Sequence, residues 1–308
     1  MIGAIGARAR DGATSITFNE RYIIMKKSIE TLIPDIHNLL IEGKKQGVDE
    51  KHLKEFFNAL REDIGIFLSG EKRDGSPRLR MSSIGRKDRK LWYEFNSNLK
   101  REELSGQDKL RFFFGNLVES FLLLLAQEAG HRVTDRQKEV VVGGIKGHID
   151  CKIDDVLVDV KSASSFGFKK FKENNLIHED PFGYVAQLSG YVQAEGGDNG
   201  YFWAYDKSNA DMVLTEIDEL TMIDVEDRVK HLKKLVKDKN IPEKCYDDKP
   251  QGSSGNRVID KNCVFCEYKF DCWKDANDGD GLRVFLYAQG KEYFTHVEKE
   301  PKVEELIV

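Results

Sequence analysis

The chain has 308 residues, of which 40% are hydrophobic and 33% are charged, and its formal net charge is -5. This is the composition of an ordinary soluble protein, long enough for one large domain or two smaller ones. The longest apolar run, 121–126, is far too short to span a bilayer, and residues 1–24 lack the hydrophobic region and cleavage site of a secretory signal. We therefore expect a cytoplasmic protein, in the host cytoplasm if the chain is viral.

The first third of the chain is expected to be helical. Residues 1–24 have the Gly, Ala and Arg content of a flexible end, and Met25 is a second candidate start alongside Met1. Two amphipathic helices are predicted within 26–70. A helical extension with a basic, polar linker is therefore expected over 25–107.

The middle of the chain alternates helical and strand patterns, which predicts an α/β core. A long apolar helix should run from about 108 to 129. A second helix should start at Asp180-Pro181, because Asp caps helices and Pro fits the first turn. Residues 162–180 are expected to be a polar loop. Strands are predicted over 134–142, 201–205 and 212–217, a hairpin over 147–161, and further helical turns over 181–195 and 219–239.

The predicted hairpin brings two carboxylates together. Its strands alternate strictly, and a two-residue loop at Asp154-Asp155 fits its turn. Counting outward from that loop sets Asp150 opposite Asp159, with Cβ atoms roughly 5 Å apart. Lys161 lies on the same face as Asp159 because strand side chains repeat every two residues. Two acids so placed repel each other, so a cation is expected between them.

A third carboxylate, Glu119, lies in the most apolar helix of the chain. A buried carboxylate is costly unless it is paired or bound to a cation, and the alternative is that Glu119 lies on an exposed edge. Beside Asp150 and Asp159 it would complete a site for Mg²⁺ or Mn²⁺. Such a metal activates water for phosphodiester hydrolysis, and the Lys161 ammonium can offset charge in the transition state.

Gln187 and Tyr191 lie one helical turn apart downstream of these residues. The series of Glu119, Asp150, Asp159-Val160-Lys161 and Gln187-x-x-x-Tyr191 resembles the PD-(D/E)xK nuclease superfamily. It is most similar to the RecB-like exonuclease branch, which includes phage exonucleases. The resemblance covers roughly residues 80–275 and implies a restriction-endonuclease-like core, with a mixed central sheet flanked by helices.

The resemblance also implies a role for each of these residues. Glu119, Asp150 and Asp159 would bind the metal with the carbonyl of Val160, and Lys161 would assist the attacking water. Gln187 and Tyr191 would support the site and the DNA backbone. Many members of this branch carry a His four residues before the Glu, where this chain has Gly115. This difference at Gly115 bears on which metal is bound and on the direction in which DNA would be digested.

Four cysteines lie close together after residue 240. Cys263-x2-Cys266-x5-Cys272 has the spacing of metal ligands, and Cys245 is the natural fourth. Cys151 belongs to the apolar face of the hairpin. The RecB-like family similarly carries a C-terminal cysteine trio that can hold a 4Fe-4S cluster, with its fourth cysteine before the nuclease core. That upstream cysteine is missing here, so a 4Fe-4S cluster and a structural Zn²⁺ both stay open, as do unligated thiols.

DNA contacts are expected from the basic linker. Residues 71–111 hold twelve Lys or Arg against seven Asp or Glu, inside an acidic chain. Basic side chains beside aromatic ones hold phosphates and stack bases in single-strand grooves. The hypothesis names Arg86, Arg89 and Lys90 with Trp92, and also Ser162 and Ser164 after the predicted catalytic Lys. A solvated helical surface is the alternative for each of them.

Taken together, these patterns predict a metal-dependent deoxyribonuclease, more specifically an exonuclease acting on DNA ends, as in phage replication, recombination or degradation. The extra helices and the cysteine segment would narrow the DNA channel and favour ends. The alternatives are a structure-selective endonuclease on the same core and a non-catalytic DNA-binding or assembly factor. The expected organisation places the nuclease core at 108–240, the cysteine segment at 241–280 and a C-terminal tail at 281–308. Polarity, strand preference and oligomeric state are not predicted.

Overall fold

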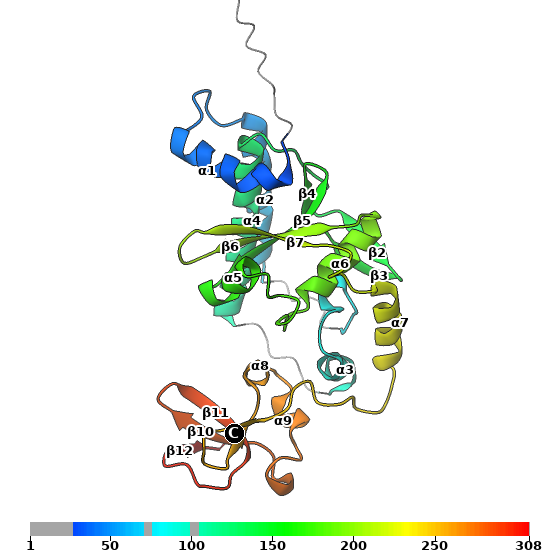
Figure 1. The fold of residues 1–308 in the computed structure, drawn as a ribbon, viewed down its shortest axis with the longest axis vertical. Coiled ribbons are helices and arrows are strands. Elements are labelled where there is room, and N and C mark those ends of the chain that lie inside the picture. Colours follow the sequence, from blue (N-terminus) through cyan, green and yellow to red (C-terminus); the bar gives the residue numbers. More distant parts are fainter. Residues whose placement is uncertain (1–26, 71–75, 99–104, 308) are drawn as a thin grey trace, which may run out of the picture.

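The computed structural model describes residues 27–70, 76–98 and 105–307. The expectations for residues 1–24, for Met25 and for part of the linker lie outside these ranges. The described chain has a central layered part and a smaller C-terminal part that follows it at one end (Figure 1). The predicted α/β class, with a mixed central sheet flanked by helices, is confirmed.

The central sheet has five strands in the order β1-β4-β5-β6-β7. Only the β5–β6 pair among them is parallel; the other pairs are antiparallel. The predicted hairpin turn is present, with Ile153 opposite Val156 and positive φ at Asp154 and Asp155, but its first strand begins at Cys151 rather than Gly147. The strands are β1 (Val133–Thr134), β4 (Cys151–Ile153), β5 (Val156–Ala163), β6 (Gly200–Asp206) and β7 (Met212–Ile217).

Helices cover both faces of this sheet (Figure 1). On one face, alternate β5 residues Val158 and Val160 pack with Leu123 of α4 (Gly106–Glu128) and Ile36 of α1 (Leu32–Glu42). On the other face, Leu157 packs with a cluster that includes side chains of α5, α6 and α7. These helices are α5 (Ser165–Lys172), α6 (Tyr184–Glu195) and α7 (Val225–Leu235). Asp159 therefore points toward the α6 face.

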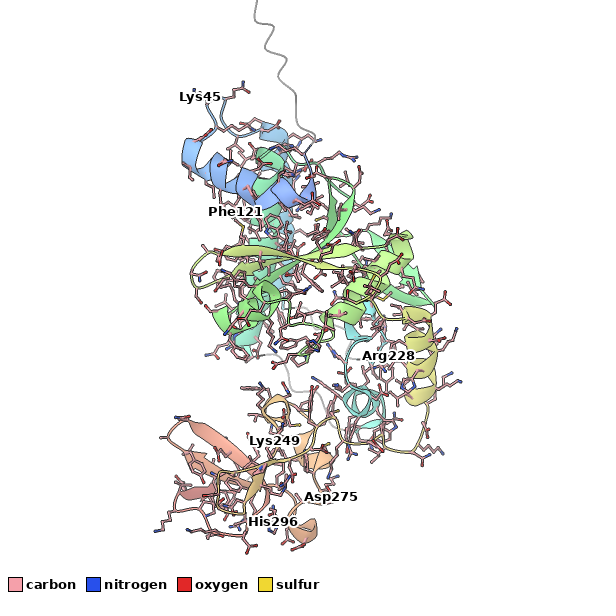
Figure 2. The ribbon with its side chains drawn as sticks, in the orientation of Figure 1. Lys45, Phe121, Arg228, Lys249, Asp275 and His296 are labelled. Carbon is pink, nitrogen blue, oxygen red and sulfur yellow. The ribbon has the colours of Figure 1, made fainter. Side chains whose placement is uncertain are left out.

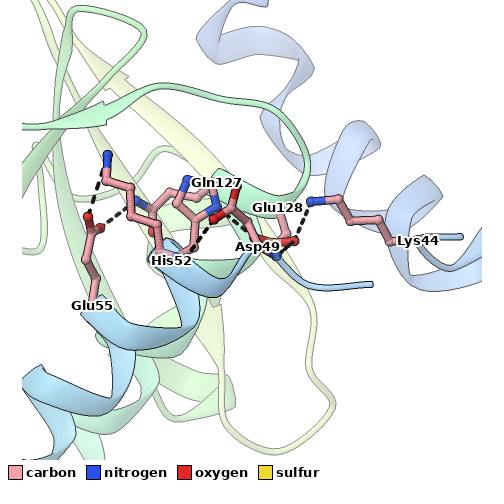
Figure 3. A network of polar contacts seen from close by, with 7 residues as sticks. Lys44, Asp49, His52, Glu55, Gln127 and Glu128 are labelled. Carbon is pink, nitrogen blue, oxygen red and sulfur yellow. Dashed lines mark hydrogen bonds and ion pairs between the residues drawn. The ribbon is translucent and has the colours of Figure 1, made fainter. Parts of the chain in front are cut away.

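The N-terminal helices are fixed to α4 by a buried carboxylate. The break between α1 and α2 (Glu50–Leu68) confirms the two predicted helices. Glu128, near the end of α4, contacts the Lys44 ammonium at 2.6 Å and His52 Nδ1 at 2.7 Å, and accepts from the Asp49 backbone N–H (Figure 3). Among the described helices, α4 alone is long and apolar enough, by length and composition, to cross a membrane.

Several predicted boundaries were wrong, each for a local reason. Residues 134–142 are not one strand, because a turn with positive φ at Asp135 and Gln137 separates β1 from β2 (Glu139–Val142). β2 pairs with β3 (Ile145–His148) in a separate two-stranded sheet. The expected loop 162–180 contains α5, which Ser164 caps and which buries Phe168 and Phe171.

The helix expected at Pro181 begins three residues later, at Tyr184. The Asp180 carboxylate accepts hydrogen bonds from the backbone N–H groups of Gly183 and Val185, so it closes a turn before the helix begins. The helix expected over 219–239 is the shorter α7, which begins after Asp224 caps it. Helix boundaries thus follow the actual capping contacts.

The C-terminal part is a second sheet with short helices. The residues expected to form a tail, 281–308, instead contain three strands, β10 (Arg283–Tyr287), β11 (Gly290–His296) and β12 (Glu304–Leu306). They join β8 (Lys249–Pro250) and β9 (Arg257–Val258) in an antiparallel sheet. Cys263 lies in α8 (Lys261–Val264) and Cys272 in α9 (Lys269–Cys272), while Cys245 and Cys266 lie outside these helices. The division into domains stays a prediction. Three 3-10 turns complete the described elements, at Ile29–Thr31, Met81–Ser83 and Asn277–Gly279.

A short helix, α3 (Asp88–Asn96), connects the two parts. The preceding segment is clamped by Arg228, which Figure 2 labels on α7. The Arg228 guanidinium donates to the carbonyls of Ile84 and Arg86 and to the Asp88 carboxylate. On the other side, Tyr93 of α3 stacks on Tyr268 with ring centroids 5.4 Å apart. The basic linker therefore acts as a structural connector.

Candidate active site

The two hairpin carboxylates meet at one end of the β4–β5 pair. One step beyond the paired Cys151 and Val158, Asp150 Oδ2 accepts a hydrogen bond of 2.8 Å from the Val160 backbone N–H. Asp159 is buried on the adjacent position of β5, and its Oδ2 forms an ion pair with the Lys161 ammonium. The predicted register therefore brings Asp150, Asp159 and Lys161 together.

Glu119 joins this group from α4. Burial raises the pKa of the Glu119 carboxyl, and the nearby Asp159 carboxylate raises it further. Burial also raises the pKa of Asp150 well above its usual range, with the charges of Asp159 and Glu119 adding to the shift. The Asp150 carboxyl is thus close to both other acids, and Glu119 is close to Asp159.

The Lys161 ammonium compensates part of this negative charge. Burial alone would lower its pKa, but Asp159 and Asp150 outweigh that effect and raise it, so the side chain is cationic. Gln187 Nε2 lies 3.4 Å from Asp159 Oδ1 and donates to the Tyr191 hydroxyl at 3.1 Å. The one-turn spacing of Gln187 and Tyr191 thus places both beside Asp159.

Two neighbours of the site were not predicted from the sequence. Tyr184 lies on the α6 face that carries Gln187 and Tyr191, and the Lys161 ammonium is 5.1 Å from the centre of its ring. Its spacing of three residues before Gln187 is a signal that could have found it. Gln137 donates to Glu119 Oε1 at 3.0 Å from the turn between β1 and β2. No sequence pattern marks that residue.

The acids fit a hard divalent cation, although the site is not pre-arranged as a coordination sphere. Within the described ranges, no group of three or more His, Cys, Asp or Glu side chains has the spacing of a metal site. Asp159 Oδ2 is nevertheless buried, and in those ranges its contact is the ion pair with the Lys161 ammonium. Carboxylate oxygens that are buried close to other acids, with one lysine beside them, are of the kind that Mg²⁺ or Mn²⁺ binds.

The predicted DNA contacts have mixed surroundings. Arg86 is paired with Glu94 at 2.6 Å, and Arg89 donates to the carbonyls of Pro242 and Cys272, so both guanidinium groups make internal contacts. Trp92 is buried and donates to the Asp238 carbonyl, so it does not offer a free face to a base. Lys90, Ser162 and Ser164 line a groove beside Lys161, and Ser164 also caps α5.

The four C-terminal cysteines gather on the opposite side of that groove. Cys245, Cys263, Cys266 and Cys272 all line it, and α3 packs against them. Burial, followed by the charges of the other three thiols, raises the pKa of Cys263 to about 12. The thiols are therefore neighbours but, in the described ranges, do not reach ligand spacing. The 4Fe-4S or Zn²⁺ site stays a prediction, and Cys151 is buried in the core as expected.

Neither a protein-family model nor a curated protein matches this sequence. Among solved structures, it is similar to SSO0001, with 19% identity, 70% of this chain and 94% of that chain covered, and a TM-score of 0.40. It is also similar to the alkaline exonuclease of Laribacter hongkongensis (15% identity, 57% and 89% covered, TM-score 0.35). A phage-related exonuclease from Haemophilus somnus is 14% identical, with 52% of this chain and 90% of that chain covered and a TM-score of 0.34. At these TM-scores the likenesses carry no argument about activity.

Proposed function

We propose that the protein is a metal-dependent deoxyribonuclease that hydrolyses phosphodiester bonds at DNA ends. The observation that carries the proposal is the convergence of three carboxylates from α4 and the β4–β5 hairpin with one buried lysine. A structural ion-pair network would pair each acid with a base. Here the pKa values of Glu119 and Asp150 are raised by burial and by neighbouring acids, although Lys161 lies beside them. Such a surplus of acids is typical of a site that binds a cation for function.

The residues divide the chemistry among them. Glu119, Asp150 and Asp159 would hold Mg²⁺ or Mn²⁺, with the Val160 carbonyl beside them. The bound ion would polarise the scissile phosphate and lower the pKa of a coordinated water. Lys161 holds its proton and stabilises negative charge that develops on the phosphate. Gln187 fixes the orientation of Asp159 through its amide, and Tyr191 in turn contacts that amide.

The preference for ends is supported by the shape around the site. A groove of about 630 Å³ is lined on one side by Lys161 and α5 and on the other by the cysteine segment. A groove walled on both sides admits a chain end more readily than the interior of a closed duplex. The cysteine segment, which forms the second wall, therefore favours exonuclease action over endonuclease action.

The test is digestion of end-labelled linear DNA with Mg²⁺, beside a closed circular DNA of the same sequence. We expect the linear substrate to be degraded and the circle to survive. Lys161→Ala should abolish digestion, while Lys146→Ala, which removes an exposed lysine paired with Glu139 on β2, should not. Cutting of closed circles would replace the exonuclease with the endonuclease reading, and equal digestion by parent and Lys161→Ala would reject the site.

A further inference from the structure

The groove between the core and the cysteine segment has walls of unusual composition. Among its described lining residues are eight lysines or arginines and only two acids, Glu179 and Asp180. Four of the lysines form no ion pair within the described ranges, namely Lys87, Lys90, Lys261 and Lys269. Lys161 and Tyr184 belong both to the groove lining and to the candidate active site, so the two adjoin. Its charge fits a polyanion rather than an apolar ligand or an acidic surface.

Aromatic rings form a path outward from the site along one wall. The Lys161 ammonium lies 5.1 Å from the centre of the Tyr184 ring. Tyr184 in turn stacks on Phe182, with ring centroids 5.3 Å apart and planes 25° from parallel. Phe182 is 64% exposed although it is a large apolar side chain. The path thus ends in a ring with an open face on the surface of the groove.

A second part of the groove, at α5 and α8, has the same combination of an exposed ring and neighbouring positive charges. Phe166 of α5 is 70% exposed, and the ammonium groups of Lys170 and Lys261 lie 5.6 and 5.9 Å from its ring centre. Lys261 belongs to α8, so this cluster joins the core to the cysteine segment. Phe265, between α8 and α9, is 94% exposed and also lines the groove. Phe166, Phe182 and Phe265 thus place three exposed rings in a groove that lysines line.

We propose that this groove binds an unpaired DNA strand, whose bases stack on Phe182 and Phe166 while the lysines contact its phosphates. Open ring faces beside cations bind single strands, because every unpaired base offers a face and every linkage a charge. In a duplex the base faces are covered, so a duplex gains from the lysines only. The inference rests on the proposed function for its substrate, and it specifies that one strand, not two, reaches Lys161.

The experiment measures binding without cleavage. Fluorescence anisotropy of a labelled oligothymidine is recorded with the full-length protein in EDTA, against a blunt duplex of the same length as competitor. We expect the single strand to bind more tightly than the duplex. Phe182→Ala should weaken strand binding about tenfold or more, Phe166→Ala similarly, and Phe182→Trp should retain it. The matched control is Phe57→Ala on α2, a 55% exposed phenylalanine outside the groove, which should bind like the parent.

The outcomes separate the inference from the proposed function. Binding by Phe182→Ala and Phe166→Ala equal to the parent, or a preference for the duplex, would overturn the strand groove even if the nuclease assay succeeds. Strand binding that depends on the two phenylalanines, without any digestion in Mg²⁺, would uphold the groove and reject the nuclease. Thermal melts accompany each variant, and because both side chains are mostly exposed, a folding defect is not expected for either.

Discussion

The acidic site and the α3 connector both begin as clusters of charged residues in the sequence, but the fold uses them differently. In the β4–β5 hairpin, a two-residue turn fixes which side chains oppose each other, so Asp150 and Asp159 converge through local geometry. In α3, the neighbours of Arg89 and Trp92 come from residues about 150 or more positions away. The register of a short hairpin can be predicted from the sequence. The sequence does not show that polar residues such as Arg89 will bond to distant segments instead of facing solvent.

The largest expected effect separates function from stability inside the acidic site. Asp150→Asn should reduce nuclease activity by about 10²-fold or more, since a carboxylate charge is lost where the cation is expected. The same variant should melt at a higher temperature than the parent, because the pKa of Asp150 is raised by burial and by its acidic neighbours. Nuclease assays and thermal melts at neutral pH measure the two effects.

The sign follows from linkage. An acid whose folded pKa lies above its unfolded value costs stability once the pH exceeds the unfolded value, and this cost disappears below it. Asp155→Asn is the control, because it makes the same change in the same hairpin at an exposed turn residue. It should leave both activity and melting temperature close to those of the parent. A destabilised Asp150→Asn protein would mean that the acids do not repel one another.

The second prediction concerns the point where the connector meets the core. The backbones of Gly85 and Gly183 touch, and a Cβ on Gly85 would lie 2.4 Å from the Cα of Gly183. Gly85→Ala should therefore cost roughly 1–3 kcal/mol, because one of two packed backbones must move. Gly65→Ala is the matched control in α2, where a Cβ meets nothing within 4 Å. That variant should be more stable by about 0.5–1 kcal/mol, since Gly is a poor helix former. Urea unfolding distinguishes these opposite signs.

The third prediction uses two neighbours on α3 that the sequence treats alike. Arg89 donates to the carbonyls of Pro242 and Cys272, so Arg89→Gln should lower the unfolding free energy by about 2 kcal/mol. Lys90 lines the groove without an ion pair in the described ranges, so Lys90→Gln should leave stability unchanged. It should instead reduce the salt slope of strand binding by about 0.7, the value for one phosphate contact. If Arg89→Gln changed the salt slope and left stability unchanged, Arg89 would contact DNA as the sequence predicted.

These cases show what the sequence could and could not supply. Alternation and turn chemistry predicted the hairpin, the β6–β7 pair and the face shared by Gln187 and Tyr191, since each depends on residues close in the chain. The sequence did not predict α5, because Phe168 and Phe171 acquire their buried partners from distant segments. It also did not predict the strands within 281–308, although β10 and β11 form a local hairpin in which Phe285 packs on Phe294. Nor did it distinguish Arg89 from Lys90, whose difference lies only in what packs against them.

The smallest expected effect contrasts the acids of the two sheets. In the C-terminal sheet, the Arg257 guanidinium and the Thr295 hydroxyl hold the pKa of Asp248 below its usual range. A lowered pKa contributes stability above the unfolded value that is lost as the pH falls through the folded value. Asp248→Asn should therefore cost about 1 kcal/mol at pH 7 and progressively less toward pH 3, the opposite of Asp150→Asn.

Melting temperatures across that range test it, and Asp247→Asn, at the neighbouring position, is the control. If the stability changes of the Asp248 and Asp150 variants followed the same pH profile, the two acids would have pKa values shifted in the same direction. The contrast between a destabilising acidic site and a stabilising ion pair would then be wrong.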